Sequence, residues 1–484
     1  MYKSIDSNVY EKAGDYNLSD IVMVSYTGKE VDITSSVAEI NIYESLFNNT
    51  LSGNIVLVDA QNLPFEFPIT GLERIEFKLS SPGFGDAKGR HYDFTSKSGH
   101  PMYLYKISDR QPLNAKTQTY VLNFCSRETI RNEQVRVSRS FTGGNVNMVL
   151  EMLRDKNYLD CKKPIFFELS GENQKYVVPN IHPFGAIRRL ADITTSDKFS
   201  ECSGYLFYEN AAGFHFKSFE SLLAKSPNLA RDPQVKYTYS ISDVSLEPAK
   251  AKDILSEMKK CSRFTLLSQQ DTIKSIKAGV ASSKLLTHDS FNKVFADHNF
   301  DYHIQYEKNF HTEHDGFKSK EDERFVLPLT PYDRKDFISS MPDSVKFFMS
   351  NTEKIHNDNE QPPVENILQK RISQRNAFDT IKIEIGVPGF TAISVGELVT
   401  FYAPSVSLQL DRATSNWDKM LSGRYLLSAV RHSINVHNEY HAMSLELLKD
   451  AYNEPLGENA EDNFTTASKD DSDVYMDQTT LDEG

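Results

Sequence analysis

The sequence predicts a mainly β protein with α+β parts, built from two similar antiparallel β-barrel domains, an α+β domain and an irregular insertion. Three observations predict this fold class. Apolar and polar residues alternate near both ends of the chain, helix patterns occur between them, and one sequence pattern occurs twice. With 484 residues, the chain is long enough for more than one hydrophobic core.

The first predicted β-domain covers residues 1–128 and is dense in strand signals. In "RIEFKL", Ile75, Phe77 and Leu79 alternate with charged residues, which indicates a strand with one buried face. "AEINIY" alternates in the same way, whereas "NIVLVDA" is a continuous apolar run that predicts a strand covered on both faces. "MYLYKISD" and "TYVLNF" predict two further strands of the same domain.

Residues 129–235 change in character and predict a separate α+β domain. In "GGNVNMVLEMLRDKN", the apolar residues from Val146 to Leu153 share one face of an amphipathic helix. "HPFGAIRRLADIT" predicts a second helix, with Pro183 in its first turn. "GYLFYEN" and "GFHFKSF" then predict two strands on either side of a turn.

The strand signal returns in two pieces, residues 236–290 and 376–451, which together predict a discontinuous second β-domain. Its strands are indicated by "KYTYSISDV", "TIKIEIGVPG", "LVTFYAP", "GRYLLSAVRHSI" and "YHAMSLELL", while "DTIKSIKAGV" fits a helix or a strand. Between the two pieces, residues 291–375 form a polar insertion or peripheral domain. Residues 452–484 are an acidic tail without apolar runs, which predicts disorder or ordering by a partner.

One pattern occurs twice, more than three hundred residues apart. "GLERIEFKL" and "GELVTFY" both have a glycine leading into a glutamate, a β-branched residue two positions later and a phenylalanine two further on. Each is followed at similar spacing by a Tyr-Leu pair and then by a strand that begins with tyrosine. The repeated signature consists of Gly71, Glu73, Phe77, Tyr103 and Tyr120 in the first copy and Gly396, Glu397, Phe401, Tyr425 and Tyr440 in the second.

The duplicated positions favour an architectural role for the two glutamates, because catalytic groups are rarely duplicated in this way. We expect Glu73 and Glu397 to accept hydrogen bonds from backbone donors or to pair across a subunit seam. Two similar β-domains per chain would let three copies present six similar faces through head-to-tail contacts that close. Sheet edges left open in one domain would then be covered by the next domain round the ring.

Composition and motifs exclude several classes of protein. A net charge of -13 disfavours a nucleic-acid reader, which needs a basic patch for phosphate contacts. The four cysteines contain no C-x-x-C pair, which is typical of reduced, buried thiols, and the first residues lack the apolar stretch of a signal peptide. No run of residues is apolar enough to predict a membrane-spanning helix.

No catalytic, cofactor-binding or metal-binding residue is predicted. The sequence contains neither a phosphate loop of the form G-x-x-x-x-G-K-[ST] nor a G-x-S-x-G nucleophile elbow. His311 with His314 and His437 with His441 lack a third metal ligand, so surface histidines are the better interpretation of both pairs. A pair of catalytic carboxylates is not excluded by counting acidic residues, but no glutamate stands in an evident apolar pocket motif.

Several segments in a specific order carry a family resemblance. They are "SGNIVLVDAQNLPFEFPITGLERIEFKLSSPG", "YVLNFCSRETIRNEQVRVSRSFTGGNVNMVLEMLRD", "VPNIHPFGAIRRLADIT" with "GYLFYENAAGFHFKSFESL", and "IGVPGF" followed by "VGELVTFYAP", "SGRYLLSAVRHSI" and "YHAMSLELLKD". In these segments the chain resembles the baseplate hub proteins of contractile-tailed bacteriophages, whose fold is shared with the hub part of type VI secretion spike proteins. The long polar stretch and the acidic tail depart from the family pattern.

The resemblance implies a structural virion protein without catalytic activity, located in the tail baseplate and assembled in the host cytoplasm. Its two β-domains would be tube domains, and a homotrimer would form a pseudo-sixfold ring. Such a ring joins the sixfold tail tube to a trimeric cell-puncturing spike, contacts other baseplate proteins and lets DNA pass without binding it. An acidic or neutral channel wall would suit that passage. The alternatives are a hub of a related contractile injection or secretion machine, and a carbohydrate-active enzyme that binds the cell envelope.

Overall fold

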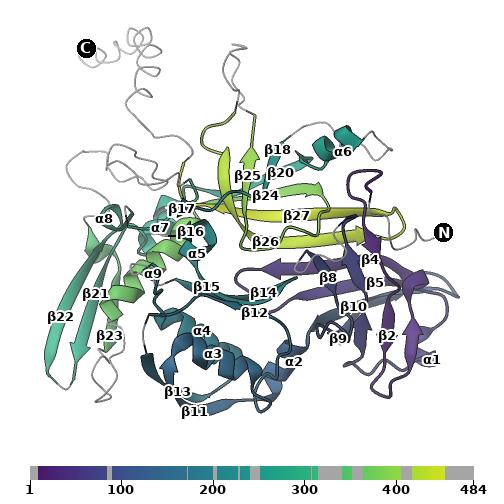
Figure 1. The fold of residues 1–484 in the computed structure, drawn as a ribbon, viewed down its shortest axis with the longest axis horizontal. Helices are drawn as coiled ribbons and strands as arrows, with labels where there is room; N and C mark the ends of the chain where they lie inside the picture. Colours follow the sequence, from purple (N-terminus) through teal and green to yellow (C-terminus); the bar gives the residue numbers. More distant parts are fainter. Residues whose placement is uncertain are drawn as a thin grey trace, which may run out of the picture.

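Most strands of the protein belong to one large mixed sheet, seen in the computed structural model of Figure 1. The structure describes residues 9–83, 90–171, 173–199, 204–226, 229–239, 251–290, 292–306, 308–313, 341–350, 364–404 and 417–452. Among these residues the path of paired strands does not close on itself, so the two closed antiparallel barrels expected from the sequence are replaced by an open sheet. The physical reason is that a strand edge of one β-unit pairs with the other β-unit.

The first β-unit has a sheet in the order β4-β5-β10-β9-β6-β2-β3, with a small sheet β1-β7-β8 beside it. Its elements are β1 (Asn17–Leu18), β2 (Val22–Val24), β3 (Glu30–Asp32), the 3-10 helix η1 (Thr34–Ser36), β4 (Val37–Ser45), β5 (Ser52–Asp59), α1 (Leu63–Glu66), β6 (Arg74–Glu76), β7 (Lys78–Ser80), β8 (His91–Asp93), β9 (Met102–Pro112) and β10 (Gln118–Ser126).

Alternation along these strands builds the core of the first β-unit, since successive side chains point to opposite faces. Ile40, Ile55 and Leu122 lie on neighbouring strands and are fully buried. The continuous apolar run in β5 was expected to be covered on both faces, and that expectation is wrong: its residues alternate between buried and partly exposed, and Val58 is exposed. The reason is that only one face of this sheet packs against a core.

The second β-unit has a sheet in the order β20-β24-β27-β26-β25-β18-β19. Its elements are β18 (Val235–Tyr239), α6 (Ala251–Glu257), β19 (Lys260–Cys261), β20 (Arg263–Gln269), β24 (Ile381–Pro388), β25 (Leu398–Tyr402), β26 (Gly423–Asn435) and β27 (Tyr440–Lys449). Buried isoleucines of β24 alternate with polar residues and pack on leucines of β27 to form its core.

The two β-units share a topology of five strands. The first has the sheet order β4-β5-β10-β9-β6, and the second has β20-β24-β27-β26-β25. In both units the strands follow one another along the chain in the same sequence, and all neighbours are antiparallel. The units differ beyond this point, because β2 is antiparallel to β6 whereas β18 is parallel to β25.

An antiparallel ladder between β4 and β26 joins the two units into one sheet. It runs from Ala429 opposite Ser45 to Asn435 opposite Glu39. Figure 1 shows β26 and β27 lying beside β4 and β5, although the two pairs come from opposite ends of the chain. The ladder covers the outer edge of β4. The matching strand of the second unit, β20, pairs only with β24 in the described part of the chain.

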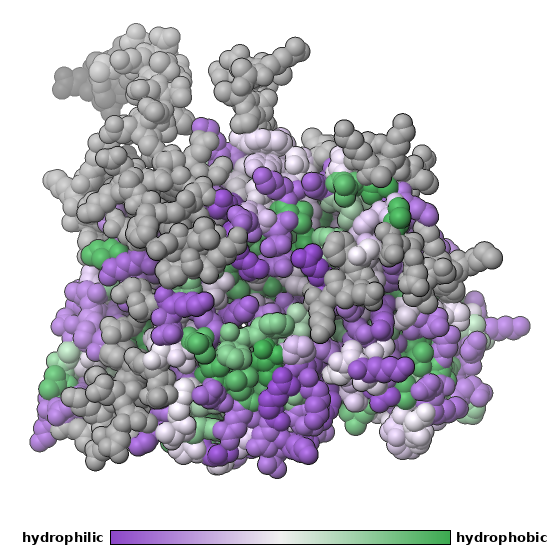
Figure 2. Space-filling model, viewed as in Figure 1, coloured by the Kyte–Doolittle hydropathy of each residue, from purple (hydrophilic) through white to green (hydrophobic). Residues whose placement is uncertain are grey.

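The α+β unit lies between the two β-units in sequence and packs beside the large sheet (Figure 1). It consists of α2 (Arg127–Gln134), β11 (Val137–Gly144), α3 (Asn145–Arg154), β12 (Ile165–Phe167), β13 (Asn173–Ile181), α4 (Pro183–Ile193), β14 (Tyr205–Asn210), β15 (Gly213–Ser218), α5 (Phe219–Leu223), β16 (Ala224–Ser226) and β17 (Leu229–Ala230). Pro183 stands in the first turn of α4, as predicted. Phe166 and Phe167 on β12 remain exposed, and Figure 2 shows hydrophobic surface over this part of the molecule.

A further small sheet, in the order β22-β21-β23, lies apart from the large one (Figure 1). Its surroundings are α7 (Thr272–Lys277), β21 (Ser282–Asp289), β22 (Val294–Asp301), α8 (Tyr302–Tyr306), the 3-10 helix η3 (Pro342–Ser344), β23 (Lys346–Ser350) and α9 (Val364–Phe378). The segment "DTIKSIKAGV", for which the sequence allowed a helix or a strand, contains helix α7. Strand β21 pairs with β22 and β23, which places the end of segment 236–290 with the insertion.

Two further expectations concern the acidic C-terminal tail and membrane-spanning helices. Apart from Tyr452, the acidic tail 452–484 lies outside the described residues. Within the described part of the chain, no helix is both long and apolar enough to cross a membrane.

Candidate functional site: the polar sheet face and its strand edges

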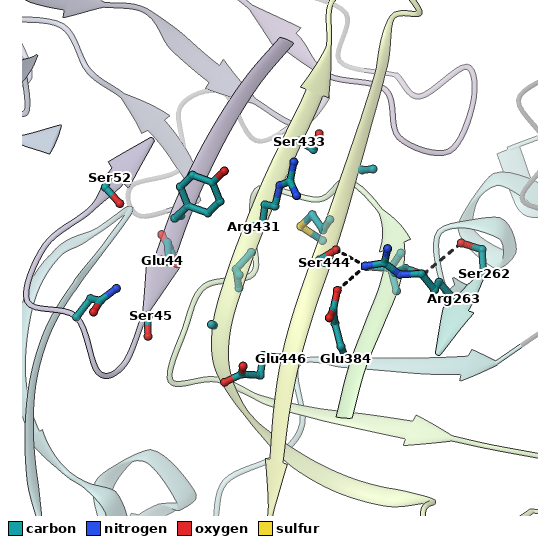
Figure 3. A pocket seen from close by; sticks show the side chains of 18 of the residues that line it. Glu44, Ser45, Ser52, Ser262, Arg263, Glu384, Arg431, Ser433, Ser444 and Glu446 are labelled. Atoms are coloured by element: carbon teal, nitrogen blue, oxygen red, sulfur yellow. Dashed lines mark hydrogen bonds and ion pairs between the residues drawn. The ribbon is translucent and has the colours of Figure 1, made fainter. Parts of the chain in front are cut away.

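The face of the large sheet that points away from the cores carries small polar side chains and paired charges (Figure 3). Serines of β4, β5, β26 and β27 line a hollow there, together with Asn48 of the turn between β4 and β5. In the described residues three ion pairs cross this face: Arg263 with Glu384, Lys382 with Glu446 at 2.9 Å, and Arg431 with Glu39 at 3.5 Å. These partly exposed pairs add ~1 kcal/mol or less each to stability, so their main effect is to balance the charge of the face.

Glu73 closes the turn that leads into β6. Its carboxylate accepts hydrogen bonds from the backbone N–H of Thr70 at 2.7 Å, the Thr70 hydroxyl at 2.8 Å and the N–H of Gly71 at 2.8 Å. The turn needs a positive φ at Gly71 (82°) and at Leu72 (119°), and the second is uncommon for a side chain of this size. The buried carboxylate thus supplies acceptors that fix this backbone shape.

Glu397 closes the corresponding turn before β25. It accepts a hydrogen bond from the backbone of Ser394, three residues earlier, as Glu73 does from Thr70. Burial raises the pKa of the Glu397 carboxyl, and the nearby Arg231 guanidinium opposes that rise. Gly396 has a positive φ of 85°, and a Cβ there would lie 2.6 Å from the Tyr208 hydroxyl. In both units the backbone carbonyl of the glutamate accepts a hydrogen bond from the backbone N–H of a leucine on the neighbouring strand, which is β9 in the first unit and β26 in the second. The N–O distances are 2.8 Å from Leu104 to Glu73 and 2.9 Å from Leu427 to Glu397.

The two phenylalanines of the repeated signature, Phe77 and Phe401, are both fully buried in their cores. The tyrosines do not match in the same way. Both β9 and β26 contain a bulge, at Tyr105 and at Ser428, and each bulge directly follows the leucine that bonds to the glutamate. Counting from these bulges, half-buried Tyr103 corresponds to Leu426, one position beyond the buried Tyr425.

The last tyrosine pair differs further. From the same bulges, the buried Tyr120 of β10 corresponds to Met443 of β27, and Tyr440 is only the first, half-buried residue of its strand. Both units have the same number of residues between the bulge and this position, so the mismatch arises because the tyrosines themselves stand at different places in the two strands. The structure therefore brings the glutamates and phenylalanines to matching places, and it does not do so for the tyrosines.

The histidines were expected at the surface, and for His311 and His441 this is wrong. His311 is buried, where its Nδ1 lies 2.8 Å from the Asp450 carboxylate. His441 is also buried, and its Nε2 lies 3.0 Å from Nδ1 of His432. His437 is exposed, and His314 lies outside the described residues. Tertiary packing decided these environments, since histidine has a polar tip and an apolar body that suit either place. The described residues contain no group of three side chains suited to a metal ion.

A buried polar network centred on Glu44 lies at the junction of the three units. Glu44 of β4 accepts from the Tyr92 hydroxyl at 2.7 Å, from the N–H of Ala211 at 2.9 Å and from the N–H of Val395 at 3.1 Å. These donors come from β8, from the turn between β14 and β15, and from the loop before β25. Burial raises the pKa of the Glu44 carboxyl to about 7, although its three hydrogen bonds oppose that rise.

The network continues into the second β-unit. The Tyr92 hydroxyl lies 2.9 Å from Nε2 of His432, which in turn contacts His441. Sequence reasoning missed this network, but a signal was present: Glu44 follows Ile40 and Ile42 at period two, so alternation places its carboxylate on the core face. The network ties both β-units and the α+β unit to one carboxylate.

Similarity to known proteins lies in the structure and not in the sequence. No protein-family model matches the sequence, and no curated protein matches it. The structure is similar to a tail protein of Neisseria meningitidis, with 10% identity, 90% of this chain and 97% of that chain covered, and a TM-score of 0.48. It is also similar to the 43 kDa tail protein of prophage MuSo2 from Shewanella oneidensis, with 11% identity, 89% and 98% covered, and a TM-score of 0.48.

A third similar structure is an Escherichia coli component of the type VI secretion system, with 8% identity, 86% of this chain and 73% of that chain covered, and a TM-score of 0.38. Over most of its length, the chain is similar in structure to phage tail proteins and to a component of the type VI secretion system.

Proposed function

We propose that this chain is the hub subunit of a phage tail baseplate. Three copies would form a pseudo-sixfold ring that joins the sixfold tail tube to a trimeric spike and lets DNA pass. The chain would act as a structural protein of the virion, without catalysis and without a cofactor. The single observation that carries this proposal is the shared topology of the two β-units together with the ladder that joins them inside one chain.

The internal ladder supplies a template for contacts between copies. Strand β26 pairs with β4, and the matching strands of the opposite units are β9 and β20. Beyond its short pairing with β6 at Met102 and Tyr103, β9 has no second partner in the described residues, and most of its later residues are exposed. The outer edge of β20 is unpaired there as well. Open edges of this kind pair readily with another chain, so β20 of one copy would pair with β9 of the next.

The register of this contact follows from the internal one. Counted through the paired strands from the matched bulges, Ser108 of β9 corresponds to Arg431, and Ser268 of β20 corresponds to Tyr43. Arg431 and Tyr43 are direct partners in the internal ladder. We therefore expect Ser108 of one copy to lie opposite Ser268 of its neighbour.

The polar sheet face suits the wall of the channel in such a ring. The ion pairs on this face balance its charges, and the residues between them are mostly small and uncharged. Among the described residues that line this hollow, the two arginines Arg263 and Arg431 are each paired with a glutamate, so they are not free to neutralise phosphates and hold the strand. A channel wall that is neutral on balance lets DNA slide past.

Covalent capture of the ring tests the proposal. The variant with both Ser108→Cys and Ser268→Cys should give a disulfide-linked species at three times the 55.1 kDa of one chain under oxidising conditions. Directly opposite residues on antiparallel strands have Cα atoms ~4.5–5.5 Å apart, which lies within the ~4.4–6.8 Å between the Cα atoms of a disulfide. A matched control combines Ile107→Cys with Ser268→Cys, because a shift of one residue turns the side chain to the other face.

Native mass measurement completes the test. The unmodified protein, alone and with its spike, should assemble in multiples of three copies. A chain that stays monomeric in the presence of its spike would overturn the ring. A control pair that forms the disulfide as readily as the serine pair would overturn it too.

A further inference from the structure

An open groove borders the edge of the first β-unit. It is lined by the turn at Leu72, by the bulge residue Tyr105 and by helices α2 and α4, which contribute Ile130 and Phe184. Leu72 is 54% exposed and Tyr105 is 53% exposed, which is unusual for two large apolar side chains in one groove. The groove lies beside the part of β9 where pairing with β6 has ended.

The corresponding place in the second β-unit is filled by the chain itself. There the N–H of Leu46, just after β4, donates to the carbonyl of the bulge residue Ser428 at 2.9 Å, and Leu46 is buried. Gly396, which corresponds to Leu72, lies against Tyr208 and Leu222. The segment that follows β4 therefore packs into this position at the internal seam.

We propose that the groove is the seat of helix α7 from a neighbouring copy of the chain. This inference rests on the proposed ring and names a second contact within it. Strand β20 takes the place of β4, so the residues after β20 take the place of the residues after β4. Counted from the match of Ser268 with Tyr43, Asp271 corresponds to Leu46, and α7 starts at the next residue.

The two surfaces are complementary in kind. Ile273 of α7 is 68% exposed, so an apolar side chain of the helix is available for the apolar groove. Lys277 at the end of α7 is exposed, and Glu133 on the rim of the groove is exposed as well, which allows an opposite-charge contact at the edge. Leu72 keeps an uncommon positive φ with its side chain exposed, where a neighbouring helix would cover it.

Cross-linking tests the seat separately from the ring. The variant with both Leu72→Cys and Ile273→Cys should link neighbouring copies, whereas Leu72→Cys with Phe295→Cys should not. Phe295 is a matched control because it is 58% exposed but lies on β22, in the separate small sheet. Variants with only one added cysteine serve as a further control, because any link that they form involves a native thiol or two copies of the same added cysteine.

The outcomes distinguish the two proposals. If the Ser108–Ser268 link forms and the Leu72–Ile273 link does not, the seat of α7 is overturned and the ring stands. If neither link forms and no oligomer appears, both are overturned. If both links form and the Leu72→Cys with Phe295→Cys control does not link, the ring and the seat of α7 are both supported.

A substitution gives an independent measurement. Ile273→Asp changes an exposed residue, so folding is unaffected, and it should raise the dissociation constant of the ring at least about tenfold through lost apolar burial. Phe295→Asp should leave that constant unchanged. Equal effects of the two substitutions, or no effect of Ile273→Asp, would overturn the seat.

Discussion

The Glu44 network makes a prediction about how stability depends on pH. Burial raises the pKa of this carboxyl from 4.5 to about 7. The folded chain therefore holds the proton in a window where the unfolded chain has released it. Stability from this group is fully present below pH 4.5 and falls as pH rises to about 7, by about 3 kcal/mol at ~1.36 kcal/mol per pKa unit.

The perturbation is Glu44→Gln, which removes the titration while keeping a side chain of similar size. Urea unfolding followed by circular dichroism, from pH 4.5 to pH 8, gives the free energy of unfolding for both proteins. The difference between wild type and variant should fall by about 3 kcal/mol across the window. Glu39→Gln is the matched control, because Glu39 stands on the same strand with its side chain on the exposed polar face.

Neighbouring groups titrate in the opposite sense and do not imitate this effect. Burial lowers the pKa of His441 to about 3 and holds the pKa of His432 well below its usual value. Their folded forms exclude the proton, so their contribution to stability rises with pH up to about 6.5. The other titratable neighbours of Glu44 are Tyr92, Tyr208 and Glu397. A difference between wild type and Glu44→Gln that stays flat between pH 4.5 and pH 7 would refute the reasoning.

Three further predictions concern stability. Glu73→Ala leaves the N–H groups of its turn without their acceptors and should cost ~1–3 kcal/mol in the free energy of unfolding, whereas Glu66→Ala at an exposed position of α1 should cost less. Lys163→Met leaves two buried carboxylates, Glu128 and Glu209, without their cation and should cost ~3–5 kcal/mol; a loss below ~1 kcal/mol would contradict this account. Gly53→Ala places a Cβ against the carbonyl oxygen of Asn41 on the paired strand β4, so the melting temperature of the variant should fall by several degrees, as differential scanning calorimetry would show.

The sequence predicted the strands of both β-units and the helices between them well, for a physical reason. Alternation at period two and repetition at three to four residues follow from the geometry of the backbone, so they can be read without a structure. The turn glutamates were found in the same way, since Glu73 and Glu397 each stand directly before a strand with a buried phenylalanine four residues later.

The register of the repeat could not be predicted. The segment from the turn glutamate to the matched leucine is one residue shorter in the second unit, from Glu397 to Leu427, than in the first, from Glu73 to Leu104. Alternation records no such difference, so Tyr103 and Tyr425 look equivalent in sequence and lie one position apart in structure. Burial of His311 and His441 was hidden as well, because Asp450, which contacts His311, and Gly14 and Gly389, which contact the backbone of His441, are distant in sequence.

The sequence alone determined which segments become strands or helices, and that one β pattern is written twice, because these properties depend on neighbours a few residues away. Only the tertiary structure decided that the two β-units share one open sheet, that β4 pairs with β26, and that β9 and β20 have edges without a partner strand among the described residues. Backbone hydrogen bonds between strands are the same for every side chain, so the choice of partner depends on how whole units pack, which no local pattern records.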